Sequence, residues 1–379
     1  TLTFTPPNTA NVKVNYPSLG MDFVYDADGR YTLNGTPYND LTSFLTATGG
    51  SFTRASIGTY FDSTGTLQTA ASGVPRFDYD PVTHTAKGIL IEESRTNLAK
   101  NSENIAAWNN NTSLTITSDV VTAPNGTMTA DTTNSVGSTR YTVASVTSGV
   151  QYTYSFFVKP TDNTKQIYLY VDGTAGIGRC RIVPSTGVIS STSGTYNSAG
   201  ITSIGNGWYR AYMVFTPTTT GNQAVHIYPL NTDVTAWWGA QLEQGAFPTS
   251  YIPTTSATVT RAADVLTIPI GSWYNASAGG IYTKFNPFDP TTAYHQIASI
   301  SGADGTSDRV SLSYSNNKGR VEVGASGALS VNTLFTSNSL SSGSDHKLAM
   351  GYANRSNIVS LSGDGSMISG NGSGSGSFI

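Results

Sequence analysis

The stretch "RFDYDPVTHTAKGILIEESRTNL", residues 76 to 98, gathers charged side chains in a chain that has few of them. Two adjacent carboxylates, Glu92 and Glu93, stand just before Arg95. Paired carboxylates are the catalytic groups of glycoside hydrolases, where they flank one glycosidic bond. Neighbouring side chains of an extended strand point to opposite faces, so these two carboxylates are expected to diverge. The spacing therefore favours a structural role, and we expect no catalytic residue here.

The structural role that this pattern predicts is docking between segments. One of the two glutamates and Arg95 are expected to form a bidentate, partly buried ion pair that holds the first 97 residues in place. Arg54 in "FTRAS" and Arg261 in "VTRAAD" lie among apolar strand residues and also need acceptors. Because the chain has only five glutamates, Glu92 or Glu93 is the obvious acceptor. We expect these five residues to form a docking cluster.

Aromatic residues indicate a different kind of site. Tyr168 and Tyr170 in "KQIYLYVDG", and His226 and Tyr228 in "QAVHIYPL", alternate with apolar residues and are predicted to face away from the core. Rings on such a face can stack on sugars while nearby polar groups orient the hydroxyls. The same rings could instead contact another subunit or lie half-exposed on an ordinary surface. All three interpretations remain open.

Two further strands extend this hypothesis. In "GNGWYRAYMVFTP" both faces are apolar, so one face is core and the other makes Arg210 and Tyr212 candidates for the same aromatic surface. In "AWWGAQLEQG" simple alternation places Trp238 and Leu242 on the core side. Trp237 is then predicted to face outward, where tryptophan is favoured at interfaces and ligand sites.

The sequence gives little support for metal or cofactor chemistry. The four histidines are scattered without zinc-binding spacing, and no G-x-S-x-G nucleophile motif is present. Asp304, Asp308 and Asp345 could join a Ca²⁺ site, but "DG" at 304 to 305 is more simply a turn. The single Cys180 is expected to be a small buried thiol. We expect no metal and no cofactor.

Composition excludes several classes of protein. The formal net charge of the 379-residue chain is -3, and no cluster of basic residues occurs, so nucleic acid is not an expected partner. No apolar run is long enough to span a membrane, and the first residues do not resemble a Sec-type signal. Charged residues make up 11% of the chain, compared with about 25% in average domains. Ser, Thr, Gly and Asn replace them, which is typical of short strands and many turns.

Period-two alternation between turn residues predicts an all-β fold in three blocks. Residues 1 to 97 are expected to be an irregular region that leans on a neighbour, with one short helix near 39 to 48 and a second, weaker helix signal at 102 to 108. Residues 98 to 253 contain a series of longer strands and are predicted to form a jelly-roll β-sandwich. Residues 254 to 379 are predicted to form a second, lectin-like sandwich that is possibly incomplete, with a Gly/Ser-rich end.

The stretch from "SFTRASIGTYFDSTG" to "GILIEESRTNLAKNSE" resembles a segment of tailed-bacteriophage tail and fibre proteins. Its F-T-R-A-S start, R-F-D-Y-D-P turn and L-I-E-E-x-R-T-N-L end match in order. The block that ends in "WWGAQLEQGAFPTSYIPTTSATVTRAADV" is similar to the carbohydrate-binding-module sandwich that usually follows that segment. The last block is similar, more weakly, to concanavalin A-like lectin domains.

This resemblance implies a structural protein on the virion surface, such as a tail fibre, that forms a homotrimer and contacts other virion proteins. It also implies host recognition through binding of host surface polysaccharide, without covalent chemistry and without membrane insertion. Two alternatives remain: a phage-borne polysaccharide depolymerase, and a head fibre, decoration or connector protein with no ligand. Because function resides in a site and not in a fold, the resemblance identifies no particular sugar.

Overall fold

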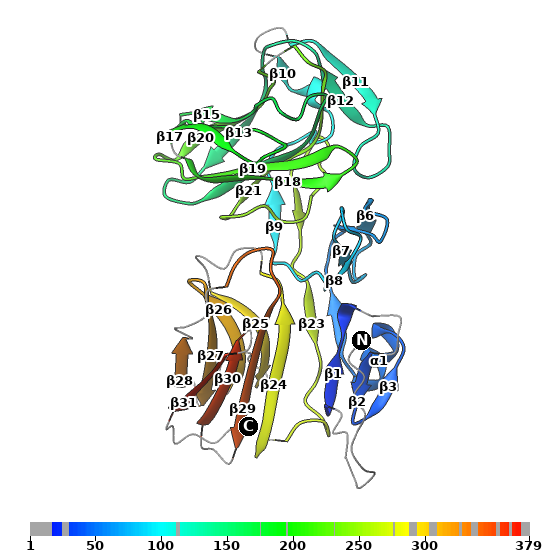
Figure 1. Ribbon diagram of the computed structural model, residues 1–379, viewed down its shortest axis with the longest axis vertical. Helices are drawn as coiled ribbons and strands as arrows, with labels where there is room; N and C mark the ends of the chain where they lie inside the picture. The colour runs from blue at the N-terminus through cyan, green and yellow to red at the C-terminus, as the bar shows by residue number, and fades with distance from the viewer. Residues whose placement is uncertain are drawn as a thin grey trace.

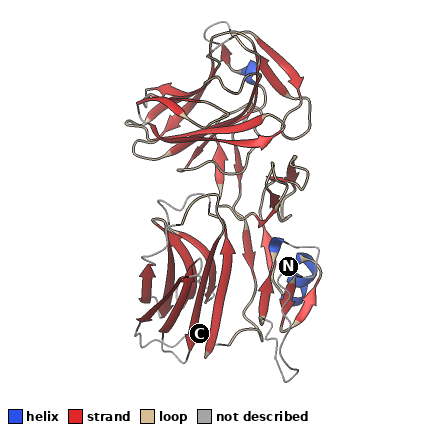
Figure 2. Cartoon of the chain, in the orientation of Figure 1, coloured by secondary structure: helices blue, strands red, loops and turns tan. Residues whose placement is uncertain are grey.

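The computed structural model describes thirteen segments of the chain, and it is almost entirely β-structure (Figures 1 and 2). The described segments are residues 17–24, 30–110, 114–174, 176–194, 196–230, 232–275, 277–287, 294–302, 309–325, 328–334, 340–353, 357–363 and 366–372. None of the helices described there is long and apolar enough to cross a membrane. The predicted all-β class, with an irregular N-terminal region and two β-sandwiches, is confirmed.

The jelly-roll sandwich consists of two six-stranded sheets in the described residues. The first, here called the β15 sheet, has the order β10 (Asn109–Asn110), β13 (Thr139–Val146), β20 (Gly221–Tyr228), β15 (Ile167–Gly173), β16 (Gly178–Ile182) and β17 (Ile189–Gly194). The second, the β14 sheet, has the order β11 (Ile116–Val121), β12 (Ala130–Thr133), β21 (Thr235–Gln244), β14 (Tyr152–Pro160), β19 (Trp208–Phe215) and β18 (Tyr196–Gly205).

Alternating side chains of both sheets fill the core between them. Leu169 and Val225 of the β15 sheet and Phe156 and Met213 of the β14 sheet are fully buried in one cluster. The residues directly before and after each of these on its strand point to the outer face of the sheet, as alternation requires. Large apolar side chains such as these remove much apolar area from water, which is the main stabilising contribution to such a core.

The N-terminal region is a set of short elements. Strands β1 (Leu19–Met21), β2 (Tyr31–Leu33) and β3 (Thr36–Tyr38) form one small sheet, and two hairpins follow, β5 (Gly58–Phe61) with β6 (Leu67–Ala70) and β7 (Phe77–Tyr79) with β8 (Ala86–Ile89). The predicted helix is present as α1 (Leu41–Thr48). Asp40 caps it by accepting from the Ser43 N–H at 2.8 Å, which satisfies an otherwise unpaired donor. The weaker signal at 102 to 108 is a single 3-10 turn, Ile105–Ala107.

Two strands from the start of the third block pair with the N-terminal region. Strand β22 (Val259–Arg261) pairs with β9 (Arg95–Asn97), and β23 (Val265–Thr267) pairs with β4 (Ser51–Thr53). The sequence boundaries at 97 and 254 stay predictions, but these pairings tie the chain before the jelly-roll sandwich to the chain after it. Figure 1 shows β9 directly below the jelly-roll sandwich and β23 in the other half of the molecule, between β24 and β1.

The last sandwich lies at the opposite end from the jelly-roll sandwich (Figure 1). In the described residues its sheets are β25 (His295–Ser301), β26 (Arg309–Ser315), β27 (Lys318–Ala325) and β28 (Ala328–Leu334), then β24 (Ala278–Phe285) with β29 (His346–Ala353), and β30 (Asn357–Gly363) with β31 (Ser366–Gly372). Its core is small and centres on Leu312 and Met350. The end of the Gly/Ser-rich segment, residues 373–379, lies outside the described residues.

Candidate functional site

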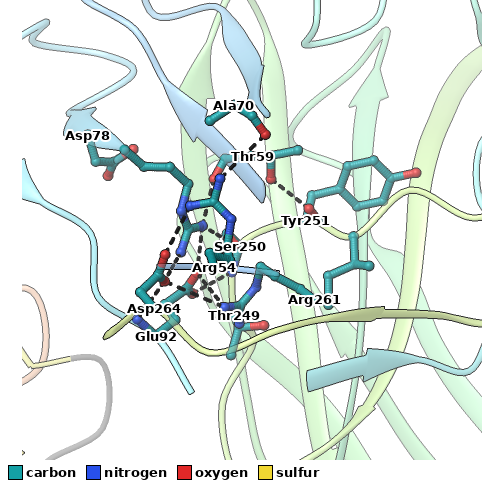
Figure 3. Close-up of polar contacts among 12 residues, drawn as sticks. Arg54, Thr59, Ala70, Asp78, Glu92, Thr249, Ser250, Tyr251, Arg261 and Asp264 are labelled. Atoms are coloured by element: carbon teal, nitrogen blue, oxygen red, sulfur yellow. Dashed lines mark hydrogen bonds and ion pairs between the residues drawn. The ribbon is translucent and has the colours of Figure 1, made fainter. Parts of the chain in front are cut away.

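Five charged side chains from distant parts of the sequence meet in one buried cluster (Figure 3). They are Arg54, Arg76, Glu92, Arg261 and Asp264, here called the charge cluster, and each side chain is at most 1% exposed. The pairings of β22 with β9 and of β23 with β4 bring them together. The cluster therefore joins the segments before and after the jelly-roll sandwich.

Asp264 is bound from two directions. The Arg54 guanidinium donates to it at 3.0 Å, and Arg76 donates to its second oxygen. The backbone N–H of Glu92 also donates to this second oxygen, at 3.0 Å. Charge-assisted bonds of this kind are stronger than neutral ones, so Asp264 fixes three segments to one point.

Glu92 is the second anchor of the charge cluster. Its Oε2 lies 2.8 Å from Arg76 Nη1 and 3.5 Å from Arg261 Nη1. Ser250, just beyond the jelly-roll sheets, donates its backbone N–H to Oε1 at 2.8 Å and its hydroxyl to Oε2 at 2.6 Å. The carboxylate thus links the N-terminal region to the chain that leaves the jelly-roll sandwich.

The electrostatic balance keeps Glu92 ionised. Burial alone would raise its pKa, but Arg261 and Arg76, together with the Ser250 hydrogen bonds, outweigh burial and hold the pKa below its ordinary value. An ionised carboxylate closed off from solvent neither donates a proton to a substrate nor contacts one. The geometry therefore fits docking and not glycoside hydrolysis.

Sequence reasoning found part of the charge cluster. Arg54, Glu92 and Arg261 meet there, but Arg76 and Asp264 were not among the predicted residues. Signals for both existed: Arg76 opens the charged stretch, and Asp264 lies three residues after Arg261 in "TRAAD". A carboxylate three residues after an arginine predicted to be buried indicates an ion-pair acceptor, and Asp264 could have been found in this way.

Of the two glutamates expected to serve Arg54 and Arg261, Glu92 pairs with Arg261, whereas Arg54 pairs with Asp264 and not with a glutamate. Glu93 lies apart from both arginines. Its side chain is 46% exposed and pairs only with Arg95, at 2.6 Å, among the described residues. Arg95 also donates to the Gln244 carbonyl and lies 5.4 Å from the Phe247 ring centre. The predicted Arg95 pair is thus a surface clamp on the end of β21, separate from the charge cluster.

Arg210 and Tyr212 do not extend the predicted aromatic surface. Both belong to β19 in the β14 sheet, whereas the tyrosine-bearing strands belong to the β15 sheet, so their outward faces point in opposite directions. Arg210 lies over the Phe157 ring at 5.3 Å and donates to the Ser155 hydroxyl at 3.2 Å. Alternation identifies which residues share a face but not which sheet a strand joins, and this prediction was therefore wrong.

Arg210 faces a second buried carboxylate, Glu243. Burial raises the pKa of Glu243 despite hydrogen bonds from Thr249 and Gln241, and burial lowers the pKa of Arg210 despite the attraction of Glu243. The Thr249 hydroxyl donates to Glu243 at 2.6 Å and the Gln241 amide at 2.7 Å. Unlike Glu92, this carboxylate is not favoured in its charged form by its surroundings.

The prediction that Trp237 faces outward was also wrong. Its side chain is fully buried in the jelly-roll core, against Phe156, while Trp238 lies on the other face of the β14 sheet beside Phe157. The cause is a β-bulge: between the pairs with Ser155 and Phe157, strand β21 carries one extra residue. Gly239, at φ 62°, provides the required left-handed conformation, and alternation reverses there.

Tyr168, Tyr170, His226 and Tyr228 do share the outward face of the β15 sheet. Tyr168 pairs with Tyr228, and Tyr170 pairs with His226, across strands β15 and β20. On the other side of β15, strand β16 contributes Arg181 opposite Tyr168 and Arg179 opposite Tyr170. We call these six residues the arginine–tyrosine face. The two arginines were not among the predicted site residues.

Neighbouring side chains cover the flat sides of the two central tyrosine rings. Arg179 lies over the Tyr170 ring at 4.9 Å, and the His226 ring stacks on it at 4.3 Å from the opposite strand. Arg181 lies over Tyr168 at 5.4 Å, and Tyr228 packs at 5.2 Å from the other side. The face therefore presents guanidinium groups and phenol edges, and not the bare aromatic platform that the sequence predicts.

Asp172 is the carboxylate at the end of this face. Its Oδ2 accepts from the Tyr170 hydroxyl at 2.7 Å, and its Oδ1 lies 3.0 Å from His226 Nε2. Burial and the bond to Asp172 raise the pKa of Tyr170, so its hydroxyl stays protonated and donates. Both carboxylate oxygens thus contact residues of the face. His226 itself is 2% exposed and packs under Tyr170.

A shallow hollow of about 420 Å³ adjoins the arginine–tyrosine face. Arg181 borders it, together with Lys165, Gln166, Val183 and Leu230. Lys165 is paired with Asp233 at 2.7 Å, whereas Arg181 reaches the hollow from the tyrosine side. Arg181 is the residue that the hollow and the arginine–tyrosine face share.

Of the three aspartates considered for a Ca²⁺ site, the structure describes Asp345. Asp304 and Asp308 lie outside the described residues, and Asp345 forms an ion pair with Lys284 at 2.6 Å. Among the residues that the structure describes, no group of three or more His, Cys, Asp and Glu side chains could hold a metal ion. Cys180 is buried in the jelly-roll core, and burial raises its pKa to about 12.

Comparisons with known proteins leave the chain without an assigned family. No protein-family model and no curated protein matches it. Among solved structures it is similar to the mouse laminin alpha1 chain, domains LG4-5, at 12% sequence identity and a TM-score of 0.18, over 61% of this chain and 75% of that chain. A likeness of this size carries no functional argument. The fold and the two sites define the chain as a protein of two β-sandwiches whose N-terminal region is held by buried ion pairs to the segment that follows the jelly-roll sandwich.

Proposed function

We propose that this chain is a structural protein of a tailed-bacteriophage particle surface, such as a tail fibre, whose jelly-roll sandwich binds host-cell glycan. The observation that carries the proposal is the arginine–tyrosine face, where Tyr168, Tyr170 and Tyr228 are half-buried on the outward side of the β15 sheet. Rings with polar tips beside cationic groups suit saccharides, whose hydroxyls need directed partners.

The charge cluster supports the structural half of this proposal. Its buried ion pairs fix the N-terminal region to the chain on both sides of the jelly-roll sandwich. A protein that transmits an attachment from particle to host needs such a rigid joint. We propose that the chain works as a homotrimer alongside other virion proteins, and that it carries out no covalent chemistry on the glycan.

A glycan array with purified chain tests the binding function. The parent should bind host surface polysaccharide, and the double variant Tyr168→Ala/Tyr170→Ala should lose that signal. Tyr282→Ala is the matched control, because Tyr282 is 63% exposed on β24 of the other sandwich. No signal from the parent on any glycan would contradict glycan binding.

The spacer function, a head fibre, decoration or connector protein without ligand, has one observation in its favour. The flat sides of Tyr168 and Tyr170 are covered by neighbours, which leaves less ring area for sugar stacking. A depolymerase is not favoured, since the carboxylates of the charge cluster are closed to solvent. Release of reducing sugar from host capsule or lipopolysaccharide by the parent chain would support that alternative.

A further inference from the structure

The arginine–tyrosine face carries two guanidinium groups with no carboxylate partner. Within the described residues, neither Arg179 nor Arg181 forms an ion pair, and each instead lies over a tyrosine ring. The nearest acidic side chain of this face, Asp172, is bound to Tyr170 and His226. Two guanidinium charges therefore face the single carboxylate of Asp172, and the described residues of the face carry an excess of positive charge.

The positions of the two arginines define a repeat. They occupy alternate residues of β16, so they point to the same side and are about 6.6 Å apart along the strand. Such a separation is comparable to one sugar unit with its linkage. Guanidinium groups bind carboxylates through two parallel N–H···O hydrogen bonds. Stacking on an aromatic ring holds a guanidinium in one orientation before the ligand binds.

From this geometry we infer that the ligand of the face is an acidic polysaccharide with carboxylated sugars, and that Arg179 and Arg181 bind carboxylates of successive units. This inference rests on the proposed glycan-binding function and names the class of its ligand. Each guanidinium lies over a tyrosine ring, and Arg179 also hydrogen-bonds the Tyr170 and Tyr168 side chains, so a sugar carboxylate bound to an arginine would lie beside these tyrosines. The guanidiniums cover the flat sides of the rings, so in this inference the arginines bind the sugar and the ring faces do not.

Isothermal titration with polygalacturonate tests the inference, with neutral dextran, dextran sulfate and a single-stranded DNA oligonucleotide as comparison probes. Polygalacturonate should bind more tightly than each of the other three. Arg179→Ala and Arg181→Ala should each weaken that binding about tenfold or more, as expected for loss of a charge-assisted pair. The corresponding lysine variants keep the charge but lose the planar donors. Their affinity for polygalacturonate should lie between those of the parent and the alanine variants.

Lys87→Ala is the matched control for net charge, since Lys87 on β8 is 43% exposed and remote in sequence from the face. It should leave polygalacturonate binding unchanged, and thermal melting should show that all variants are folded. A trisaccharide of galacturonate should bind far more tightly than the monosaccharide, because two units are read at once.

The outcomes separate this inference from the proposed function. Equal binding of dextran and polygalacturonate, lost with Tyr168→Ala/Tyr170→Ala but not with the arginine variants, would overturn the acidic ligand and retain glycan binding. Equal binding of dextran sulfate or DNA would reduce the face to a general polyanion surface and also overturn the inference. Absence of binding to every probe and to host polysaccharide would overturn both proposals.

Discussion

Replacing Glu92 by glutamine should destabilise the chain far more than the same change at its neighbour Glu93. Glu92 lies 2.8 Å from Arg76 and 3.5 Å from Arg261 and is 1% exposed, so the variant leaves three buried guanidiniums facing the single carboxylate of Asp264. Removing one partner of a buried ion pair costs about 3 to 5 kcal/mol. For a cooperative unit of about 150 to 250 residues, each kcal/mol lowers Tm by about 2 to 4 °C, so the expected fall in Tm is about 6 to 20 °C.

Glu93→Gln is the matched control, since it removes the same charge one residue away. Its side chain is 46% exposed and pairs once, so the expected loss is about 0 to 1 kcal/mol. Denaturant unfolding followed by circular dichroism measures both variants. Equal losses of stability, or an unchanged midpoint for Glu92→Gln, would refute the reasoning that the charge cluster is a structural joint.

The same residue predicts an acid dependence. The pKa of Glu92 in the folded chain is below its ordinary value of 4.5, because the two arginines outweigh burial. Its stabilising contribution is therefore present above that value and is lost as pH falls through the lower, folded-state pKa. Between neutral pH and pH about 3 the stability gap between parent and Glu92→Gln should narrow. A gap that stays constant would contradict the assignment.

Three other outcomes follow from the structure. Gly239→Ala should cost about 2 kcal/mol or more, since the new Cβ would lie 2.7 Å from the Phe157 ring at a left-handed φ; Gly149→Ala, at φ 77° in open space, measures the conformational part alone. Glu243→Gln should cost less in a denaturant titration than Glu92→Gln, because burial already disfavours the charge on Glu243; a larger loss would be contradictory. The Cys180 thiol, with its pKa raised to about 12, should not react with a disulfide reagent at pH 8 until the chain is unfolded; rapid reaction of the native chain would show an open core.

Local pattern was sufficient for much of the fold. Alternation in β15 separates Leu169 from Tyr168 and Tyr170 as predicted, because a strand has only two faces. The helix near residue 41 follows from the spacing of Leu41 and Phe44 and from Asp40 at its cap. Each of these inferences uses residues that are close in sequence.

The failures come from features that alternation does not contain. One extra residue at Gly239 exchanged the faces of Trp237 and Trp238, and no period-two pattern marks a bulge. Sheet membership placed Arg210 on the opposite side from Tyr170, since it depends on which strands pair.

Long-range assembly decided the candidate sites. Asp264 meets Arg54 from 210 residues away in the sequence, through strand pairings that join both ends of the jelly-roll sandwich. Arg179 and Arg181 became visible as site residues only once β16 was placed beside β15. The sequence contains these residues, but it does not show which distant residues they contact in the folded chain.

A crystal structure of the chain with a galacturonate trisaccharide tests the account most directly. We expect sugar carboxylates to bind the guanidiniums of Arg179 and Arg181 on the outward side of the β15 sheet. The charge cluster around Glu92 should remain buried, with the same ion pairs. Sugar bound instead against Glu92 or Glu243 would contradict the division between a structural joint and a recognition face.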